Sequence, residues 1–118
     1  MSSGKALREL IAQEGMAVAP GCYDGLTAKL IRQAGFNCIY MSGGSTSSAH
    51  GYPDYGLLTM SEMVENASRV ADAVDVPVIS DADNGYGNEL KGQAGSIAAI
   101  LPDESELSII KIPLSVKE

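Results

Sequence analysis

The chain contains 118 residues and carries a formal net charge of −7, with 45% apolar and 19% charged residues. This length and composition predict a single globular domain rather than a disordered chain. The negative charge argues against a nucleic-acid or anionic-membrane partner, because such surfaces need clustered Lys and Arg side chains. No stretch approaches the ~20 apolar residues of a membrane span. We therefore expect a soluble, cytoplasmic protein.

The few cysteine and histidine residues restrict the metal chemistry of the chain. Cys22 and Cys38 form no C-x-x-C motif, and His50 is the one histidine. This set cannot build a zinc site of a common kind. We expect two reduced thiols, as is usual in the cytosol.

The first third of the chain predicts two helices around a short strand. Apolar spacing predicts a helix over residues 3–13 with a glycine stop at Gly15. The run MAVAP, residues 16–20, predicts the first strand, and Asp24 is a candidate N-cap for the next helix, which would end at Gly35. The apolar face expected for this second helix consists of Leu26, Leu30, Ile31 and Ala34.

Two further strands are predicted at residues 36–41 and 76–80. Residues 42–56, SGGSTSSAHGYPDYG, predict a long loop, because they are rich in Gly and Ser and show no apolar period. Thr59 and Glu62 match a capping box that opens a third helix. Alternating helices and strands in this order are typical of a parallel α/β sheet. The apolar stripe expected for the third helix consists of Met63, Ala67, Val70, Ala71 and Val74.

Two aspartates follow the third predicted strand. Asp81 and Asp83 share one face of the strand, because side chains at i and i+2 point the same way. Such an oxygen-rich pair fits Mg²⁺, which is commonly held by one or two carboxylates together with substrate oxygens. The alternative is that one aspartate caps the following turn and the other is solvated.

Candidate ligand-binding groups also follow the second predicted strand. The Ser42-Gly43-Gly44 turn offers backbone N–H groups for a carboxylate or a developing oxyanion, although a flexible surface loop is the alternative. Asp54 could orient a substrate or help bind a metal, and His50 could transfer protons, or both could simply be exposed. Tyr40 is expected to be half-buried, with a partner for its hydroxyl.

Four segments in order resemble the isocitrate lyase and phosphoenolpyruvate phosphonomutase superfamily from about residue 4 to residue 90: GCYDGLTAKLIRQAGF, IYMSGG, GYPDYG and VPVISDADNGYGN. The resemblance implies an α/β fold, the N-terminal portion of a (β/α)8 TIM barrel with parallel strands and alternating helices, truncated after the third strand. Residues 1–90 would form this part of the barrel, and residues 91–118 a divergent tail of unknown structure. Residues 108–116 of that tail are a candidate edge strand.

The activity implied by the resemblance is that of a Mg²⁺-dependent carbon–carbon lyase, with Mn²⁺ as an alternative metal. Its small-molecule substrate would be a 2-oxo or 2-hydroxy di- or tricarboxylate, and the reaction would pass through a pyruvate-like enolate, as in methylisocitrate lyase, dimethylmalate lyase or oxaloacetate decarboxylase. By the same resemblance, the metal site would hold Asp81 and Asp83, the substrate carboxylate would bind Ser42, Gly43 and Gly44, and the catalytic residues would be Asp54 and Tyr40.

Other interpretations remain open at the level of the sequence. The chain could be a phosphonomutase of the carboxyvinyl-carboxyphosphonate phosphorylmutase type, a non-catalytic module that binds Mg²⁺ or a carboxylate, or an interaction fragment. The family's Lys-Cys-Gly-His loop is not found after residue 90, so the chain alone is expected to be inactive. The family is homo-oligomeric, and open sheet edges would allow this chain to associate with itself.

Overall fold

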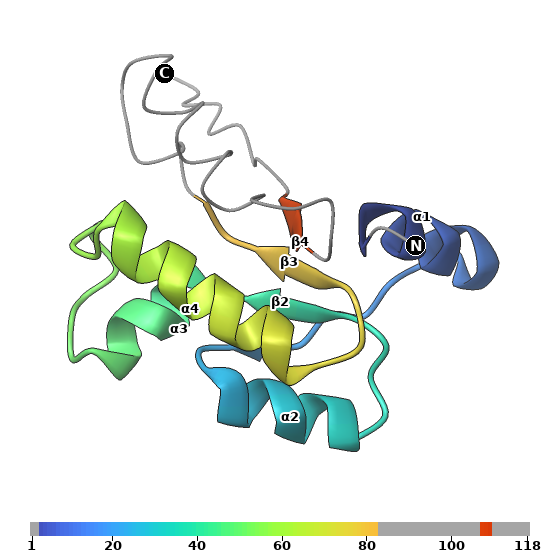
Figure 1. Cartoon of the computed structure of the whole chain (residues 1–118), viewed down its shortest axis with the longest axis horizontal. Helices are drawn as coiled ribbons and strands as arrows, with labels where there is room; N and C mark the ends of the chain where they lie inside the picture. The colour runs from blue at the N-terminus through green and yellow to red at the C-terminus, as the bar shows by residue number, and fades with distance from the viewer. Residues whose placement is uncertain (1–2, 83–106, 110–118) are drawn as a thin grey trace, which may run out of the picture.

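The computed structural model of the chain describes residues 3–82 and 107–109 (Figure 1). Helices and short strands alternate over most of this part. In chain order they are α1 (Ser3–Glu14), β1 (Gly21–Cys22), α2 (Gly25–Gln33), β2 (Ile39–Met41), α3 (Gly43–Ala49), α4 (Met60–Ala73), β3 (Val78–Ser80) and β4 (Leu107–Ile109).

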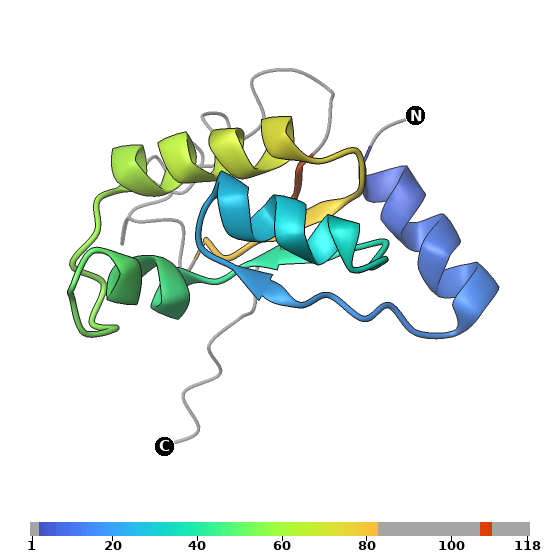
Figure 2. The same cartoon turned by 90° about the horizontal axis from the view of Figure 1, so that it is seen from below.

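The strands form one parallel sheet in the order β1-β2-β3-β4. Tyr40 in β2 is level with Gly21 in β1 and with Ile79 in β3. Helices α2 and α4 pack side by side over one face of the sheet, while α1 and α3 lie at opposite ends of the molecule (Figure 2). The predicted class, an α/β fold with parallel strands and alternating helices, is therefore confirmed. Because the strands are parallel, their carboxyl ends meet at one edge, where such sheets place their ligands.

The core lies between the sheet and the helix pair α2–α4. Ile39 and Met41 of β2 and Val78 of β3 are at most 1% exposed, and each such side chain stabilises the fold by roughly 1.5–3 kcal/mol. The two helices approach closely at Gly25, where an added Cβ would lie 3.5 Å from the Cβ of Ala73. The buried cluster consists of Cys22, Ala28, Ile39, Met41, Leu58, Met63, Ala67, Val70 and Val78.

Both predicted helix caps are present. The Asp24 carboxylate accepts a hydrogen bond from the Thr27 backbone N–H at 2.7 Å, and the Thr27 side chain accepts one in return from the Asp24 N–H. The Thr59 hydroxyl accepts from the Glu62 N–H at 3.2 Å, which is the N-cap half of the capping box predicted there. Such caps are worth about 1 kcal/mol each, because they satisfy donors that the first turn of a helix leaves without partners.

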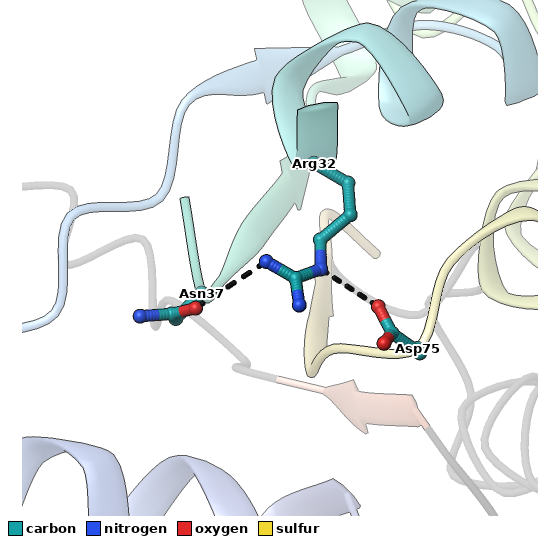
Figure 3. Close-up of polar contacts among 3 residues, drawn as sticks. All are labelled: Arg32, Asn37 and Asp75. Carbon is teal, nitrogen blue, oxygen red and sulfur yellow. Dashed lines mark hydrogen bonds and ion pairs between the residues drawn. The ribbon is translucent and has the colours of Figure 1, made fainter. Parts of the chain in front are cut away.

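An exposed ion pair joins the segments that precede β2 and β3. Arg32, near the end of α2, donates through Nε to Asp75 Oδ1 at 2.7 Å and through Nη1 to Asn37 Oδ1 at 3.5 Å (Figure 3). The hydrogen bond from Arg32 lowers the pKa of the Asp75 carboxyl below its ordinary value. This contact lies where the strands begin, away from the edge that is expected to bind ligands.

The first strand is not where the sequence predicted it. Residues 16–20 form no strand, and β1 is the pair Gly21–Cys22. Met16 is 67% exposed and Val18 is 54% exposed, so this apolar run is not a buried strand. Pairing with β2 sets the position of β1, because the Pro20 carbonyl accepts the Tyr40 N–H at 3.0 Å and the ladder continues from there.

The predicted apolar face of α2 is wrong in part. Leu26 is 66% exposed and Leu30 is 54% exposed, whereas Ala28 is fully buried and Ile31 packs against the core. Close packing against α4 requires small residues at the contact, so the buried side of α2 is set by Gly25 and Ala28 rather than by the leucines.

The remaining strands are shorter than predicted. The strand predicted at residues 36–41 comprises Ile39–Met41, and the strand predicted at 76–80 comprises Val78–Ser80. The candidate edge strand at 108–116 is present as Leu107–Ile109, parallel to β3. Residues 110–116, the predicted boundary at residue 90 and Asp83 lie outside the described residues. No helix in the described part of the chain is long and apolar enough to cross a membrane.

Candidate functional site

The turn after β2 is the start of a helix and not of a loop. Residues 42–56 were predicted to be a loop, but Gly43–Ala49 form α3, with Ser42 as its N-cap. The Ser42 Oγ accepts the Ser45 N–H at 3.1 Å, and the Ser42 carbonyl accepts the Thr46 N–H at 3.0 Å. Gly and Ser are weak helix formers and give no apolar period, so the helix depends on this cap and on its buried residues Thr46 and Ser47.

The carboxylate of Asp81 lies against this turn. Asp81 follows β3 and accepts hydrogen bonds through Oδ2 from the Tyr40 hydroxyl and from the Gly43 N–H, each at 3.3 Å. A Cβ added at Gly43 would lie 2.6 Å from Asp81 Oδ2, so only glycine fits at this position without moving the carboxylate. The structure thus brings together Tyr40, Gly43 and Asp81 from two neighbouring strand ends.

A second carboxylate approaches the same turn at the next residue. Asp54 lies on the connection between α3 and α4, and its Oδ2 would be 3.1 Å from a Cβ added at Gly44. The two adjacent glycines, Gly43 and Gly44, therefore each pack against a different carboxylate. Without side chains of their own, they let two acidic groups come close to one piece of backbone.

An open cleft of about 800 Å³ lies on the Gly44 side of the turn. Asp54 is the one carboxylate among its lining residues, and Tyr40 and Asp81 do not line it. The described residues that line the cleft include neither Lys nor Arg, so an anionic ligand would need a cation from elsewhere. The lining consists of Tyr23, Ser42, Gly44, Ser45, Ser48, Ala49 and Asp54.

The first turn of α3 contributes Gly44 to the lining of the cleft. The first N–H groups of a helix have no acceptor inside the helix. Here Gly43 donates to Asp81 and Ser45 donates to the Ser42 hydroxyl. The Gly44 N–H occupies the position between them, and Gly44 lines the cleft. This N–H is thus a candidate donor to a ligand oxygen.

His50 is placed away from the cleft lining. It is the C-cap of α3, its Nδ1 lies 2.9 Å from the Thr46 carbonyl oxygen, and its ring stacks on Tyr52 with centroids 6.3 Å apart. Because a carbonyl oxygen can only accept, the hydrogen bond places the proton on Nδ1. The structure gives His50 a capping contact rather than a contact with the cleft.

Four residues of the cleft lining were not singled out from the sequence, namely Tyr23, Ser45, Ser48 and Ala49. Ser45 and Ser48 follow Ser42 at intervals of three, so they would have been found on the same side if residues 42–49 had been recognised as a helix. Tyr23 follows β1, at a strand end where a ligand-contacting residue was to be expected. No sequence pattern distinguishes this tyrosine from a surface residue.

The donor set fits a hard cation such as Mg²⁺. The groups gathered around the two glycines are carboxylate, hydroxyl and backbone groups, without sulfur or imidazole ligands. Within residues 3–82 and 107–109 no three His, Cys, Asp or Glu side chains form a metal-binding group. Mg²⁺ commonly takes one or two protein carboxylates and completes its shell with water or ligand oxygens.

Both cysteines are buried and free. Burial, followed by the negative charge of Asp24, raises the pKa of the Cys22 thiol to about 11. Burial also raises the pKa of the Cys38 thiol. Since the thiolate is the reactive form, neither residue is suited to act as a nucleophile.

Comparison with known proteins identifies the family. The family model described as phosphoenolpyruvate phosphomutase matches residues 7–102. A 2,3-dimethylmalate lyase from Eubacterium barkeri is 49% identical over 89 residues, which cover 75% of this chain and 31% of that protein. A chloroplastic carboxyvinyl-carboxyphosphonate phosphorylmutase from Arabidopsis thaliana is 42% identical over 106 residues, which cover 81% of this chain and 31% of that protein.

Solved structures give the same result. Phosphoenolpyruvate phosphomutase from Streptomyces platensis subsp. rosaceus superposes with a TM-score of 0.81 at 33% identity, over 92% of this chain and 38% of that chain. Phosphonopyruvate hydrolase in complex with oxalate and Mg²⁺ superposes with a TM-score of 0.73 at 33% identity, over 88% of this chain and 35% of that chain. The fold is thus part of the barrel-like fold of these enzymes.

This chain spans about a third or less of the length of the curated relatives named above. The match nevertheless includes both strand ends of the site and the helices that position them, because it runs from residue 7 to residue 102. The resemblance noted in the sequence is confirmed. The chain belongs to the phosphoenolpyruvate phosphomutase family, within the superfamily that also contains the isocitrate and methylisocitrate lyases.

Proposed function

We propose that this chain carries part of the active site of a Mg²⁺-dependent carbon–carbon lyase. The substrate would be a 2-oxo or 2-hydroxy di- or tricarboxylate, as the names of its dimethylmalate lyase and methylisocitrate lyase relatives suggest. The observation that carries the proposal is the packing of two carboxylates, Asp81 and Asp54, against the adjacent glycines Gly43 and Gly44. This arrangement concentrates negative charge where a metal ion and an anionic ligand could meet.

Each residue has a definite task in this proposal. Asp81, together with Asp83, would hold the metal, and the Tyr40 hydroxyl and the Gly43 N–H keep the Asp81 carboxylate in place by donating to it. The Gly44 N–H and the Ser42 hydroxyl would orient the substrate carboxylate, and Asp54 would orient the substrate or the water around the metal. When bound, Mg²⁺ would supply the positive charge that stabilises an enolate-like anion.

The backbone donors of the turn contribute through their fixed position. Gly43 and Gly44 lie in the first turn of α3, whose N-cap hydrogen bonds hold the backbone in place before any ligand arrives. Donors that need no reorganisation stabilise developing negative charge most effectively. The open cleft of about 800 Å³ beside them is large enough for a small di- or tricarboxylate.

Phosphonomutase chemistry is the second candidate function. It is favoured by the family model, described as phosphoenolpyruvate phosphomutase, and by the 42% identity to a phosphorylmutase. The same turn and carboxylates would serve this reaction, because phosphonates and carboxylates both present anionic oxygens. Oxalate, an isostere of the enolate, can serve as a probe of the site for either function. The two candidate functions predict that different ligands displace it.

Calorimetric titration of the chain with Mg²⁺, followed by oxalate, tests the proposal. We expect Asp81→Asn to weaken Mg²⁺ binding at least about tenfold, whereas Asp72→Asn, the same charge change at an exposed position on α4, leaves it unchanged. Displacement of oxalate by dimethylmalate or methylisocitrate supports the lyase, and displacement by phosphonopyruvate alone supports the mutase. Equal Mg²⁺ affinity in both variants would refute the metal site.

We further propose that the 118-residue chain by itself binds these ligands without turning them over. The cleft residues that the structure describes supply hydroxyls and one carboxylate, and His50 is engaged with the Thr46 carbonyl. Because this proposal assigns Asp54 to orienting the substrate or the water around the metal, the group that transfers the proton would have to come from another segment. Release of a 2-oxo acid by the purified chain in the presence of Mg²⁺ would contradict this expectation.

A further inference from the structure

We infer that Asn66 is a positioning residue that holds together two segments of the chain that line the cleft. Asn66 lies in α4 and is half-buried. Its side-chain Nδ2 donates to the Tyr23 carbonyl oxygen at 2.9 Å and to the Thr46 Oγ1 at 3.4 Å. Tyr23 follows β1 and Thr46 belongs to α3, so one amide group joins three separate elements.

The direction of each hydrogen bond follows from the chemistry of its acceptor. A carbonyl oxygen can only accept, so the amide atom beside Tyr23 must be the nitrogen. The Thr46 hydroxyl donates its own proton to the Ser42 carbonyl at 2.6 Å and therefore accepts from Asn66. The bonds form a single chain from Asn66 through Thr46 to Ser42, and such chains strengthen their members.

This hydrogen-bond chain ends at residues that line the cleft. Tyr23 and Ser42 both line the cleft, and Thr46 is only 1% exposed. The buried Thr46 hydroxyl requires partners, because an unsatisfied buried polar group is destabilising. Asn66 supplies one of them. Its function is to fix the separation between Tyr23 and the Ser42 turn, which sets the width available to a ligand.

The inference rests on the proposed function only where it concerns ligand binding. The positioning role itself concerns how well Asn66 orders the backbone of the chain when no ligand is bound. The two can be tested separately, by amide hydrogen exchange without ligand and by oxalate titration with Mg²⁺. If the chain binds no oxalate while exchange responds as expected, the proposed function fails and the positioning stands.

The experiment compares Asn66→Ala with Ser68→Ala, a matched substitution at an exposed position on the same helix. In Asn66→Ala we expect exchange of the amides of residues 43–49 to accelerate about tenfold, because two hydrogen bonds that oppose local opening are lost. Exchange in α2 should stay the same, as should every rate in Ser68→Ala. Oxalate affinity should fall by a similar factor in Asn66→Ala alone.

A second pair of variants tests the same hydrogen-bond chain from the other side. Thr46→Ser retains the hydroxyl that links Asn66 to Ser42, whereas Thr46→Val removes it at nearly unchanged volume. Only the valine variant should reproduce the faster exchange, and adding Asn66→Ala to it should have little further effect. Unchanged exchange at residues 43–49 in Asn66→Ala, or an equal acceleration throughout the chain, would overturn the inference.

Discussion

Replacement of Gly43 by alanine tests the contact between the glycine turn and Asp81. The new Cβ would lie 2.6 Å from Asp81 Oδ2 and 3.1 Å from Asp81 Cγ. Both separations are shorter than van der Waals contact allows, so the carboxylate must move and lose its hydrogen bond from the Gly43 N–H. We expect Gly43→Ala to lower the free energy of unfolding by about 1–2 kcal/mol.

A loss of stability would identify the contact with Asp81 as its cause, because alanine in a helix normally makes a protein more stable than glycine does, by ~0.5–1 kcal/mol. The Asp81→Ala background supplies the matched control. In this variant the Oδ2 and Cγ atoms that would clash are absent, and the Cβ at position 81 lies 3.7 Å from the new Cβ, which is an ordinary contact. In that background Gly43→Ala should be neutral or stabilising, which gives a coupling energy of at least about 1 kcal/mol.

Urea denaturation of the four proteins in this cycle measures the coupling energy. Gly44→Ala provides a graded comparison, because its Cβ would meet Asp54 Oδ2 at 3.1 Å and Asp54 lies on an exposed connection that can shift. We expect its effect on stability to be smaller than that of Gly43→Ala. Equal destabilisation by Gly43→Ala with Asp81 present and absent would refute the close contact between the turn and the carboxylate.

Three further predictions concern the rest of the molecule. The lowered pKa of Asp75 means that its pair with Arg32 stabilises the fold above the ordinary carboxyl pKa of ~4, and that this contribution is lost as the pH falls through the lowered value. Asp75→Asn should therefore reduce the slope of the melting temperature against pH on the acid side. An unchanged slope would contradict the pairing. Cys22 and Cys38 should resist an aromatic disulfide reagent at pH 8 in the native state and react with it in urea, because burial raises the pKa of both thiols. Rapid labelling of the native protein would contradict this, because it would show that one of the thiols is accessible. Leu30→Ala should change the free energy of unfolding by less than about 1 kcal/mol in thermal melts, because the side chain is 54% exposed, and a loss of 2–5 kcal/mol would place this leucine in the core instead.

Local signals in the sequence predicted most of the elements correctly. The caps at Asp24 and Thr59 and the glycine stops at Gly15 and Gly35 depend on neighbouring residues alone, and the structure contains all of them. The apolar stripe of α4 was equally clear, since Met63, Ala67, Val70 and Ala71 are buried. These features need no knowledge of the partner strand or helix.

The errors have a common physical origin in tertiary contacts. Residues 16–20 looked like a strand, but a strand forms only where a neighbour pairs with it, and β2 pairs with Gly21 and Cys22. Leu26 and Leu30 looked buried, but α4 packs against the small residues of α2. Helix α3 was missed because its Gly- and Ser-rich sequence has no helical signal apart from its cap, and the burial of Thr46 and Ser47 that supports it is a tertiary contact.

The sequence identified most residues of the candidate site but not the contacts between them. Because Asp81 directly follows β3 and the Ser42 turn follows β2, both belong to the edge where the carboxyl ends of parallel strands meet. The contact of Asp81 with the Gly43 N–H depends on how β2 and β3 pair, and the approach of Asp54 to Gly44 depends on how the connection after α3 folds back; no local pattern encodes either. Asn66 was not recognised for the same reason, because its two partners are 43 and 20 residues away in the sequence.

Titration of the chain with oxalate in the presence and absence of Mg²⁺ tests the proposed metal-dependent carboxylate site most directly. The described lining of the cleft carries Asp54 and hydroxyl groups without Lys or Arg, so the dianion should be repelled unless a metal ion is bound first. We predict binding heat with Mg²⁺ present and none after chelation of the metal. Oxalate binding of equal affinity in both conditions would contradict the account.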